Sequence, residues 1–249
     1  MAQLAEIISW LDAELRTSEI PDYPGAINGL QLQNNGTVTH VAAAVDASLP
    51  VIRKAVSAGA DLLVVHHGMF WQGAQPLTGA FYEKIRCAIE HNLAIYSSHL
   101  PLDVHPQLGN NAQLAAAIGL TDYRPFLPWK NLPIGICGSL SIHRDDLRQR
   151  LEAAVGSPVH LCPGGPEIIE TVGLCTGGAG SEVAQARNLD AFITGEGPHW
   201  SYPLAEELGV NLFYAGHYAT ETFGVKAVAD RISQKFGVTN TFIHHPTGL

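Results

Sequence analysis

The sequence predicts a duplicated α/β fold with mixed sheets, and two observations carry this prediction. Short apolar strands alternate with amphipathic helices along the first half of the chain, an alternation typical of a parallel or mixed sheet covered by helices. The second half then repeats the order of the first, which is evidence for an internal duplication. We expect one α/β lobe over residues 1–125 and a second over residues 126–249.

The first half supplies its elements in a regular order. Apolar residues at helical spacing predict an amphipathic helix over residues 3–16. Three strands are expected, at residues 40–45, 61–65 and 93–97. Two helices are expected between them, at residues 50–58 and 78–91. Gly109, Asn110 and Asn111 offer an N-cap for a further helix up to residue 118, and Pro125, Pro128 and Pro133 then indicate a linker.

The second half echoes these elements. Residues 171–175 are expected to form a strand, followed by a glycine-rich loop at 177–180 and a helix that starts at 182. Residues 190–196 match 61–67 in pattern, and residues 211–214 match 92–96. Both members of this last match, 92–96 and 211–214, are followed by a histidine with a carboxylate four residues later. The two pairs are His99 with Asp103 and His217 with Glu221. The order of these matches predicts that corresponding strand ends face each other across a cleft.

Composition excludes several classes of protein. With 249 residues and 46% hydrophobic content, the chain can bury a substantial core. A formal charge of −9 argues against tight non-specific binding to nucleic acid, which depends on Lys and Arg. No apolar run is long enough to span a bilayer, and the N-terminus lacks the features of a signal peptide. Four cysteines without a Cys-x-x-Cys pair suit reduced thiols, so we expect a cytoplasmic protein.

Two adjacent histidines, His66 and His67, end an apolar strand, and ligands bind at that edge of an α/β sheet. A single His–His pair is more often a chance polar strand end, but further nitrogen and oxygen ligands follow the other predicted strands. The candidates are His66, His67, His99, Asp103, His217 and Glu221. Such a set without cysteine suits zinc, manganese or iron(II). Six ligands exceed what one tetrahedral ion needs, so we expect two divalent ions, with Glu221 placed to bridge them.

Four segments carry a resemblance to a known family: Val-His-His-Gly at 65–68, His-Leu-Pro-Leu-Asp at 99–103, Leu-Gly-Asn-Asn-Ala at 108–112 and Gly-His-Tyr-Ala-Thr-Glu at 216–221. The chain resembles the NIF-three-like proteins, often described as GTP cyclohydrolase 1 type 2 homologues, over nearly its whole length. The resemblance implies two intertwined α/β repeats, a toroidal homohexamer and a dinuclear metal site in each subunit. It implies as metal ligands His66, His67, Asp103, His217 and Glu221. It leaves His99 a supporting or proton-transfer role, and Tyr218 stands where close relatives often have histidine.

Two functions remain open. The first is a dinuclear metal-dependent hydrolase that acts on a nucleotide or purine-type heterocycle, with His99 or Glu196 transferring the proton. Phe70 and Trp71 are candidates to stack on the substrate ring. The second is a non-catalytic, metal-stabilised toroidal scaffold or protein-interaction factor.

Overall fold

The computed structural model describes all 249 residues and divides the chain into two compact units. Unit 1 contains Met1–His105 and Gly224–His245, and unit 2 contains Pro106–Phe223 and Pro246–Leu249. This division differs from the expected 1–125 and 126–249, for two reasons. Helix α5 (Asn110–Ile118) packs its apolar side chains into the core of unit 2, and the last helix and strand return to unit 1.

Unit 1 is built on a five-stranded sheet with the order β13-β4-β5-β6-β2. Its centre is parallel, and the strands are β4 (His40–Asp46), β5 (Leu62–His67) and β6 (Ala94–Ser97). The last strand, β13 (Thr239–Phe242), joins β4 in parallel, and β2 (Gly29–Leu32) joins β6 antiparallel. Two short strands, β1 (Ala2–Gln3) and β3 (Thr37–Val38), pair with each other.

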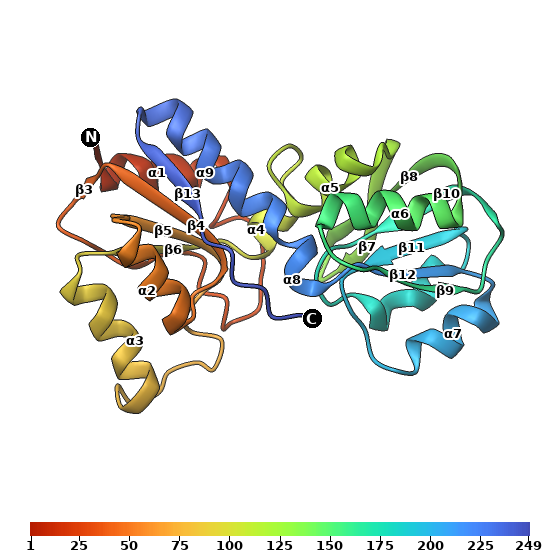
Figure 1. Ribbon diagram of the computed structural model, residues 1–249, viewed down its shortest axis with the longest axis horizontal. Helices are drawn as coiled ribbons and strands as arrows, with labels where there is room; N and C mark the ends of the chain where they lie inside the picture. The colour runs from red at the N-terminus through yellow and green to blue at the C-terminus, as the bar shows by residue number, and fades with distance from the viewer. The chain divides into compact units, whose positions relative to one another are not determined.

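Helices cover both faces of this sheet (Figure 1). Helices α2 (Leu49–Ser57) and α3 (Gly79–Glu90) lie on one face, and α1 (Leu4–Glu14) and α9 (Thr222–Phe236) lie on the other. Alternate residues of the strands, such as Leu63 and Val65, pack with α2 and α3, because successive side chains of a strand point to opposite faces. The strands and helices expected in this half are confirmed. No helix in the protein combines the length and apolar character needed to cross a membrane.

Unit 2 contains a six-stranded mixed sheet. Its strands, in spatial order, are β7 (Thr121–Trp129), β8 (Leu132–His143), β10 (Ile168–Leu174), β11 (Ala191–Thr194), β12 (Asn211–Tyr214) and β9 (His160–Pro163). Helices α5 and α6 (Arg144–Val155) pack on one face. Helix α7 (Ser201–Leu208) and the 3₁₀ helix η1 (Gly180–Ala186) pack on the other. The helix expected from residue 182 is therefore a 3₁₀ helix that begins at Gly180.

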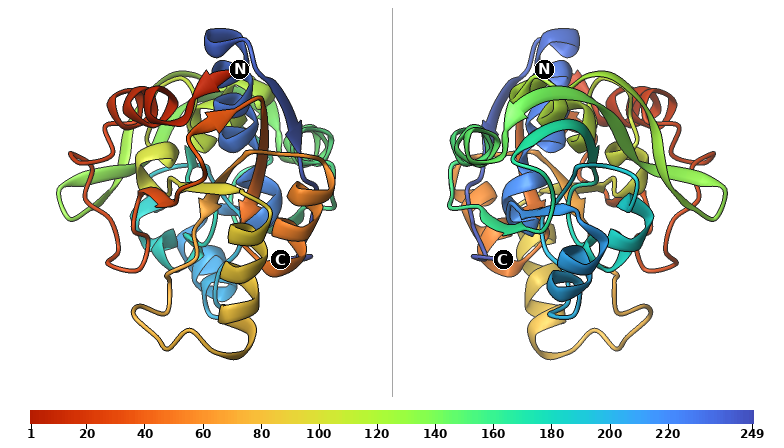
Figure 2. Two further views of the ribbon diagram at one scale, coloured as in Figure 1. Left: turned by 90° about the vertical axis from the view of Figure 1, so that its left-hand side faces the viewer. Right: turned by 90° about the vertical axis from the view of Figure 1, so that its right-hand side faces the viewer.

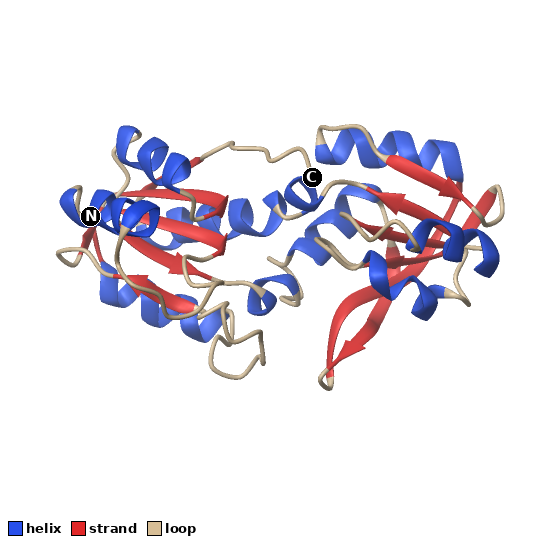
Figure 3. Ribbon diagram, turned by 90° about the horizontal axis from the view of Figure 1, so that it is seen from below, coloured by secondary structure: helices blue, strands red, loops and turns tan.

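The prediction of a linker at the three prolines is wrong, because this segment forms the hairpin of β7 and β8. Pro125 and Pro128 lie in β7, the edge strand, where the missing N–H costs no central ladder bond. Lys130 and Asn131 both have positive φ, which makes the tight two-residue turn that hairpins favour. Figures 2 and 3 show this hairpin extending from the sheet edge.

The strand order of the two units supports the duplication. The parallel strands β4-β5-β6 and β10-β11-β12 follow the same order, and in each unit an antiparallel strand flanks the third, β2 in unit 1 and β9 in unit 2. The matched residues Asp61 and Asp190 also make equivalent hydrogen bonds to the backbone. The Asp61 carboxylate accepts hydrogen bonds from the backbone N–H groups of Thr39 and His40, and Asp190 accepts them from Glu170 and Thr171.

The backbone register corrects one detail of the expected match. In unit 1, Leu62 lies opposite Ala94, and in unit 2, Ala191 lies opposite Asn211. Asn211 therefore corresponds to Ala94 and not to Asn92, the residue matched from the sequence.

Candidate metal centre

Three histidines gather at the carboxyl end of the parallel strands of unit 1. His66 and His67 are the last two residues of β5, and His99 is the N-cap of the short helix α4 (Leu100–Asp103) that follows β6. One ring nitrogen from each of these histidines lies within 4.8 Å of the others. His66 is fully buried, and the other two are partly buried. This edge of a parallel sheet is where α/β proteins bind ligands.

Each histidine ring in this cluster is held at Nδ1 by an oxygen atom. The contacts are His66 to the Ser98 carbonyl at 2.9 Å, His67 to Asp46 at 2.9 Å, and His99 to Asp22 at 2.8 Å. A ring nitrogen that faces a carbonyl or carboxylate carries the proton, so the lone pair of the neutral ring is on Nε2. Histidines that bind metals are typically held in this way.

Asp22 and Asn28 together position His99. The Asp22 carboxylate also accepts hydrogen bonds from the Asn28 amide and from the Leu100 N–H, and the Asn28 carbonyl oxygen accepts one from the His99 N–H. Burial alone would raise the pKa of Asp22, but the hydrogen bonds and the neighbouring His99 outweigh it and lower that pKa below its ordinary value. The carboxylate therefore stays ionised and keeps the His99 ring in place.

Asp103 is the last residue of the short helix α4. Its Oδ2 atom lies 3.4 Å from Nε2 of the buried His66. This separation is long for a hydrogen bond between these groups. It matches the roughly 3.4 Å between two ligands that each lie about 2.1 Å from one tetrahedral ion.

Unit 2 contains a second histidine–carboxylate cluster. His217 is the first residue of the short helix α8 (His217–Thr220), and the buried Glu221 follows this helix directly. The Nδ1 atom of His217 lies 2.9 Å from Glu196, and its Nε2 atom lies 3.2 Å from Glu221. Burial lowers the pKa of His217, but the hydrogen bonds and charges of Glu221 and Glu196 outweigh it and raise the pKa to about 9. Glu196 thus orients the ring on the side away from Glu221.

Glycines let the backbone pack closely against this second cluster. A Cβ atom on Gly195 would lie 2.6 Å from the Gly177 carbonyl oxygen and 2.6 Å from the His217 Cα. Gly177 has a φ of +71°, and a Cβ there would overlap the Glu221 carboxylate. The glycine-rich loop at 177–180 is thus a close-packing element beside His217 and Glu221.

The two aromatic residues expected to hold a substrate ring, Phe70 and Trp71, lie in different environments. Phe70 packs edge-on against Phe81, with ring centroids 6.0 Å apart, beside the core formed with α2 and α3. Trp71 is 38% exposed, and its ring centroid lies 4.8 Å from that of His99 and 5.9 Å from that of His67. Of the two residues, Trp71 is therefore the one beside the histidines.

Sequence reasoning missed three residues that support these histidines: Asp22, Asn28 and Asp46. Asp46 could have been found, because it ends β4 directly beside His67 in the sheet register. Asp22 and Asn28 gave no comparable signal, since they come from the loop before β2, more than 70 residues before His99.

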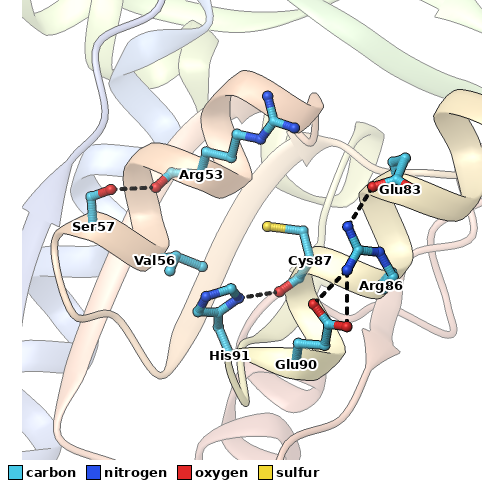
Figure 4. Close-up of a pocket in the computed structure, with 8 residues that line it drawn as sticks. All are labelled: Arg53, Val56, Ser57, Glu83, Arg86, Cys87, Glu90 and His91. Carbon is cyan, nitrogen blue, oxygen red and sulfur yellow. Dashed lines mark hydrogen bonds and ion pairs between the residues drawn. The ribbon is translucent and has the colours of Figure 1, made fainter.

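A cavity of about 400 Å³ lies on α2 and α3 of unit 1, away from these residues (Figure 4). None of the predicted site residues line it. Its Arg86 guanidinium is bound by Glu83 and Glu90, and its Cys87 backbone carbonyl accepts a hydrogen bond from His91.

The fold and the two clusters define a duplicated α/β protein with histidine–carboxylate groups suited to metal ions. The chain belongs to the family described as Duf34/NIF3 (NGG1p interacting factor 3), whose model matches residues 2–247. This confirms the resemblance found in the sequence.

Relatives and solved structures agree with this assignment. A protein of Deinococcus radiodurans named "GTP cyclohydrolase 1 type 2 homolog" is 41% identical over 98% of this chain and 94% of its own length. One of the same name from Escherichia coli K12 is 36% identical over 97% of each chain. The solved structure of the protein ybgI, described as of unknown function, has a TM-score of 0.91 and 34% identity over 99% of this chain and 100% of its own. Reduced HcgD from Methanocaldococcus jannaschii has a TM-score of 0.86 and 25% identity over 98% of each chain.

Proposed function

We propose that this protein is a metal-dependent hydrolase with a dinuclear centre that acts on a nucleotide or related purine-type heterocycle. One observation carries the proposal. All four histidines of the two clusters have Nδ1 held by an oxygen atom: the Ser98 carbonyl or the carboxylates of Asp46, Asp22 and Glu196. In His66, His67 and His217 this contact would direct Nε2 toward an ion, as in known metal sites. The name "GTP cyclohydrolase 1 type 2 homolog" given to relatives supports the substrate class.

The residues fit two divalent ions of zinc, manganese or iron(II). We assign as ligands His66, His67, Asp103, His217 and Glu221, with Glu221 as the bridge. These are nitrogen and oxygen donors without a thiolate, the set that such ions accept. The distances of 3.4 Å between His66 and Asp103 and 3.2 Å between His217 and Glu221 suit pairs that share an ion.

The protein's own groups would orient the ligands and transfer protons. Ions of this kind, when bound, polarise a substrate oxygen and make a bound water more acidic. Asp46 and Glu196 hold the rings of His67 and His217, so each Nε2 keeps its direction. His99, held by Asp22 at Nδ1, has Nε2 as the atom that accepts and returns the proton. Glu196 is the second candidate for this step.

The test is a nucleotide panel that includes GTP, with chelated protein and protein reloaded with zinc, manganese or iron(II). We expect hydrolysis only after reloading, and its loss in His66→Ala and Asp103→Asn. His143→Ala is a matched control, because His143 is the last residue of β8, lies 3.8 Å from Asp145 and belongs to neither cluster. Equal turnover by chelated and reloaded protein would exclude this mechanism.

The second candidate function is a metal-stabilised scaffold, and the family description as an interacting factor favours it. In both cases we expect a toroidal homohexamer, which native mass spectrometry measures directly. A hexamer that falls apart on chelation, together with no turnover of any nucleotide, would favour the scaffold.

A further inference from the structure

An aromatic pocket of about 370 Å³ lies in unit 2, outside the residues predicted from the sequence. It is lined by His160, Gly197, Pro198, His199, Tyr202 and Tyr214. Four of these six residues carry aromatic or imidazole rings: His160, His199, Tyr202 and Tyr214. The volume falls within the range of small-molecule sites.

Two aromatic rings with nearly parallel planes form one wall of this pocket. His160 in β9 and Tyr214 in β12 are cross-strand partners, so their side chains lie next to each other on one face of the sheet. Their ring planes differ by only 15°, with centroids 6.3 Å apart. Tyr202 on α7 adds a third ring, 5.7 Å from His160 and tilted by 40°. Aromatic faces of this kind suit a planar ring, and stacking on them tolerates different bases.

The wall is held in position before any ligand arrives. The Tyr214 hydroxyl is hydrogen-bonded to the Ser201 hydroxyl, which also contacts the Pro198 carbonyl. A Cβ atom on Gly180 would lie 3.0 Å from the Tyr214 ring, so the absence of a side chain at Gly180 lets this ring pack closely against the backbone. A ring fixed in this way loses little conformational entropy on binding.

The pocket adjoins the second cluster within the same unit. Tyr214 is the last residue of β12, three positions before His217, and Gly197 directly follows Glu196, whose carboxylate holds His217. Both strand ends belong to the carboxyl edge of the parallel strands β11 and β12. A ring in the pocket would therefore lie beside the residues that we assign to the metal centre.

We propose that this pocket binds the planar heterocyclic ring of the substrate, with His160, Tyr202 and Tyr214 as the stacking surface. The choice of a heterocycle as substrate rests on the proposed function, but the binding itself requires neither metal nor turnover. These three residues lie in unit 2, whereas Phe70, one of the two ring holders expected from the sequence, packs beside the core of unit 1.

The experiment measures binding of guanosine and adenosine to chelated protein by calorimetry, with ribose 5-phosphate as a ligand that lacks the ring. We expect both nucleosides to bind and the sugar phosphate not to bind. Tyr202→Ala and His160→Ala should each weaken nucleoside binding by at least about tenfold, the usual loss when a stacking ring is removed. His160→Phe should retain binding, because it keeps the ring. Tyr82→Ala is a matched control, since Tyr82 is an exposed tyrosine on α3 of unit 1.

His160 is exposed, so its removal tests binding even if Tyr202→Ala proves unstable. Nucleoside binding that neither variant weakens, or no binding by the parent protein, would overturn the pocket assignment while leaving hydrolysis to its own test. Ring-dependent binding without turnover in reloaded protein would support the pocket and refute the hydrolase.

Discussion

Replacing Asp46 with asparagine should weaken metal binding without unfolding the protein. Asp46 holds Nδ1 of His67 at 2.9 Å, and the neutral amide turns a charge-assisted hydrogen bond into an ordinary one of about half the strength. Changes to such supporting residues typically cost 10- to 100-fold in metal affinity. The Asp46 side chain is 32% exposed, so solvent screens part of its effect, and we expect a loss near tenfold.

The assay is competition with a chromophoric chelator for zinc and manganese, with thermal unfolding of the metal-free proteins alongside. The control is Asp145→Asn, because Asp145 lies 3.8 Å from His143 on the surface of unit 2 and belongs to neither cluster. Metal dissociation constants within twofold of the parent for Asp46→Asn, or an equal loss in the control, would refute the view that Asp46 directs a ligand.

Three further outcomes are expected. Glu221→Ala should remove more metal than His99→Ala by elemental analysis, because Glu221 is the assigned bridge; a parent protein with a single tightly bound ion would contradict the dinuclear assignment. The pKa of His217 is raised from 6.5 to about 9 in the metal-free fold, so an ion must displace a proton below pH 9. The affinity of the protein for the ion should therefore rise by up to about tenfold per pH unit from 6.5 to 9. The protonated His217 stabilises the metal-free fold; this stability is complete below pH 6.5 and should be lost as pH rises through 9. Metal affinity that does not change over this range in chelator competition would contradict this. Gly195→Ala should lower the free energy of unfolding by about 1–3 kcal/mol in a urea titration, because the new methyl group meets backbone atoms at 2.6 Å; unchanged stability would show that the loop can move aside.

The sequence was sufficient for the parts of the fold that depend on periodicity. The run that ends at His66 and His67 located β5, and the match of residues 61–67 with 190–196 located β11. The prolines of β7 led to the wrong prediction of a linker, because an edge strand tolerates proline. The local sequence does not indicate that a strand will lie at the edge of its sheet.

Spacing alone could not settle how the two histidine–carboxylate pairs correspond. Both pairs have the same separation, but His99 caps α4 from outside, whereas His217 is the first residue within α8. One position along a helix rotates a side chain by about 100°. The equal spacing therefore hides a different placement on the two helices, which only the backbone register reveals.

The path of the chain has a consequence for how this protein is made. Unit 1 is left at His105 and completed only by residues 224–245, so its strand β4 must wait nearly the whole length of synthesis for its neighbour β13. All the strands of unit 2 emerge from the ribosome before that, and domains generally fold as units during synthesis. Such distant pairing is slow to form. The half-made first sheet, with β4 still an open edge, is thus the species that needs protection from aggregation in a growing cell.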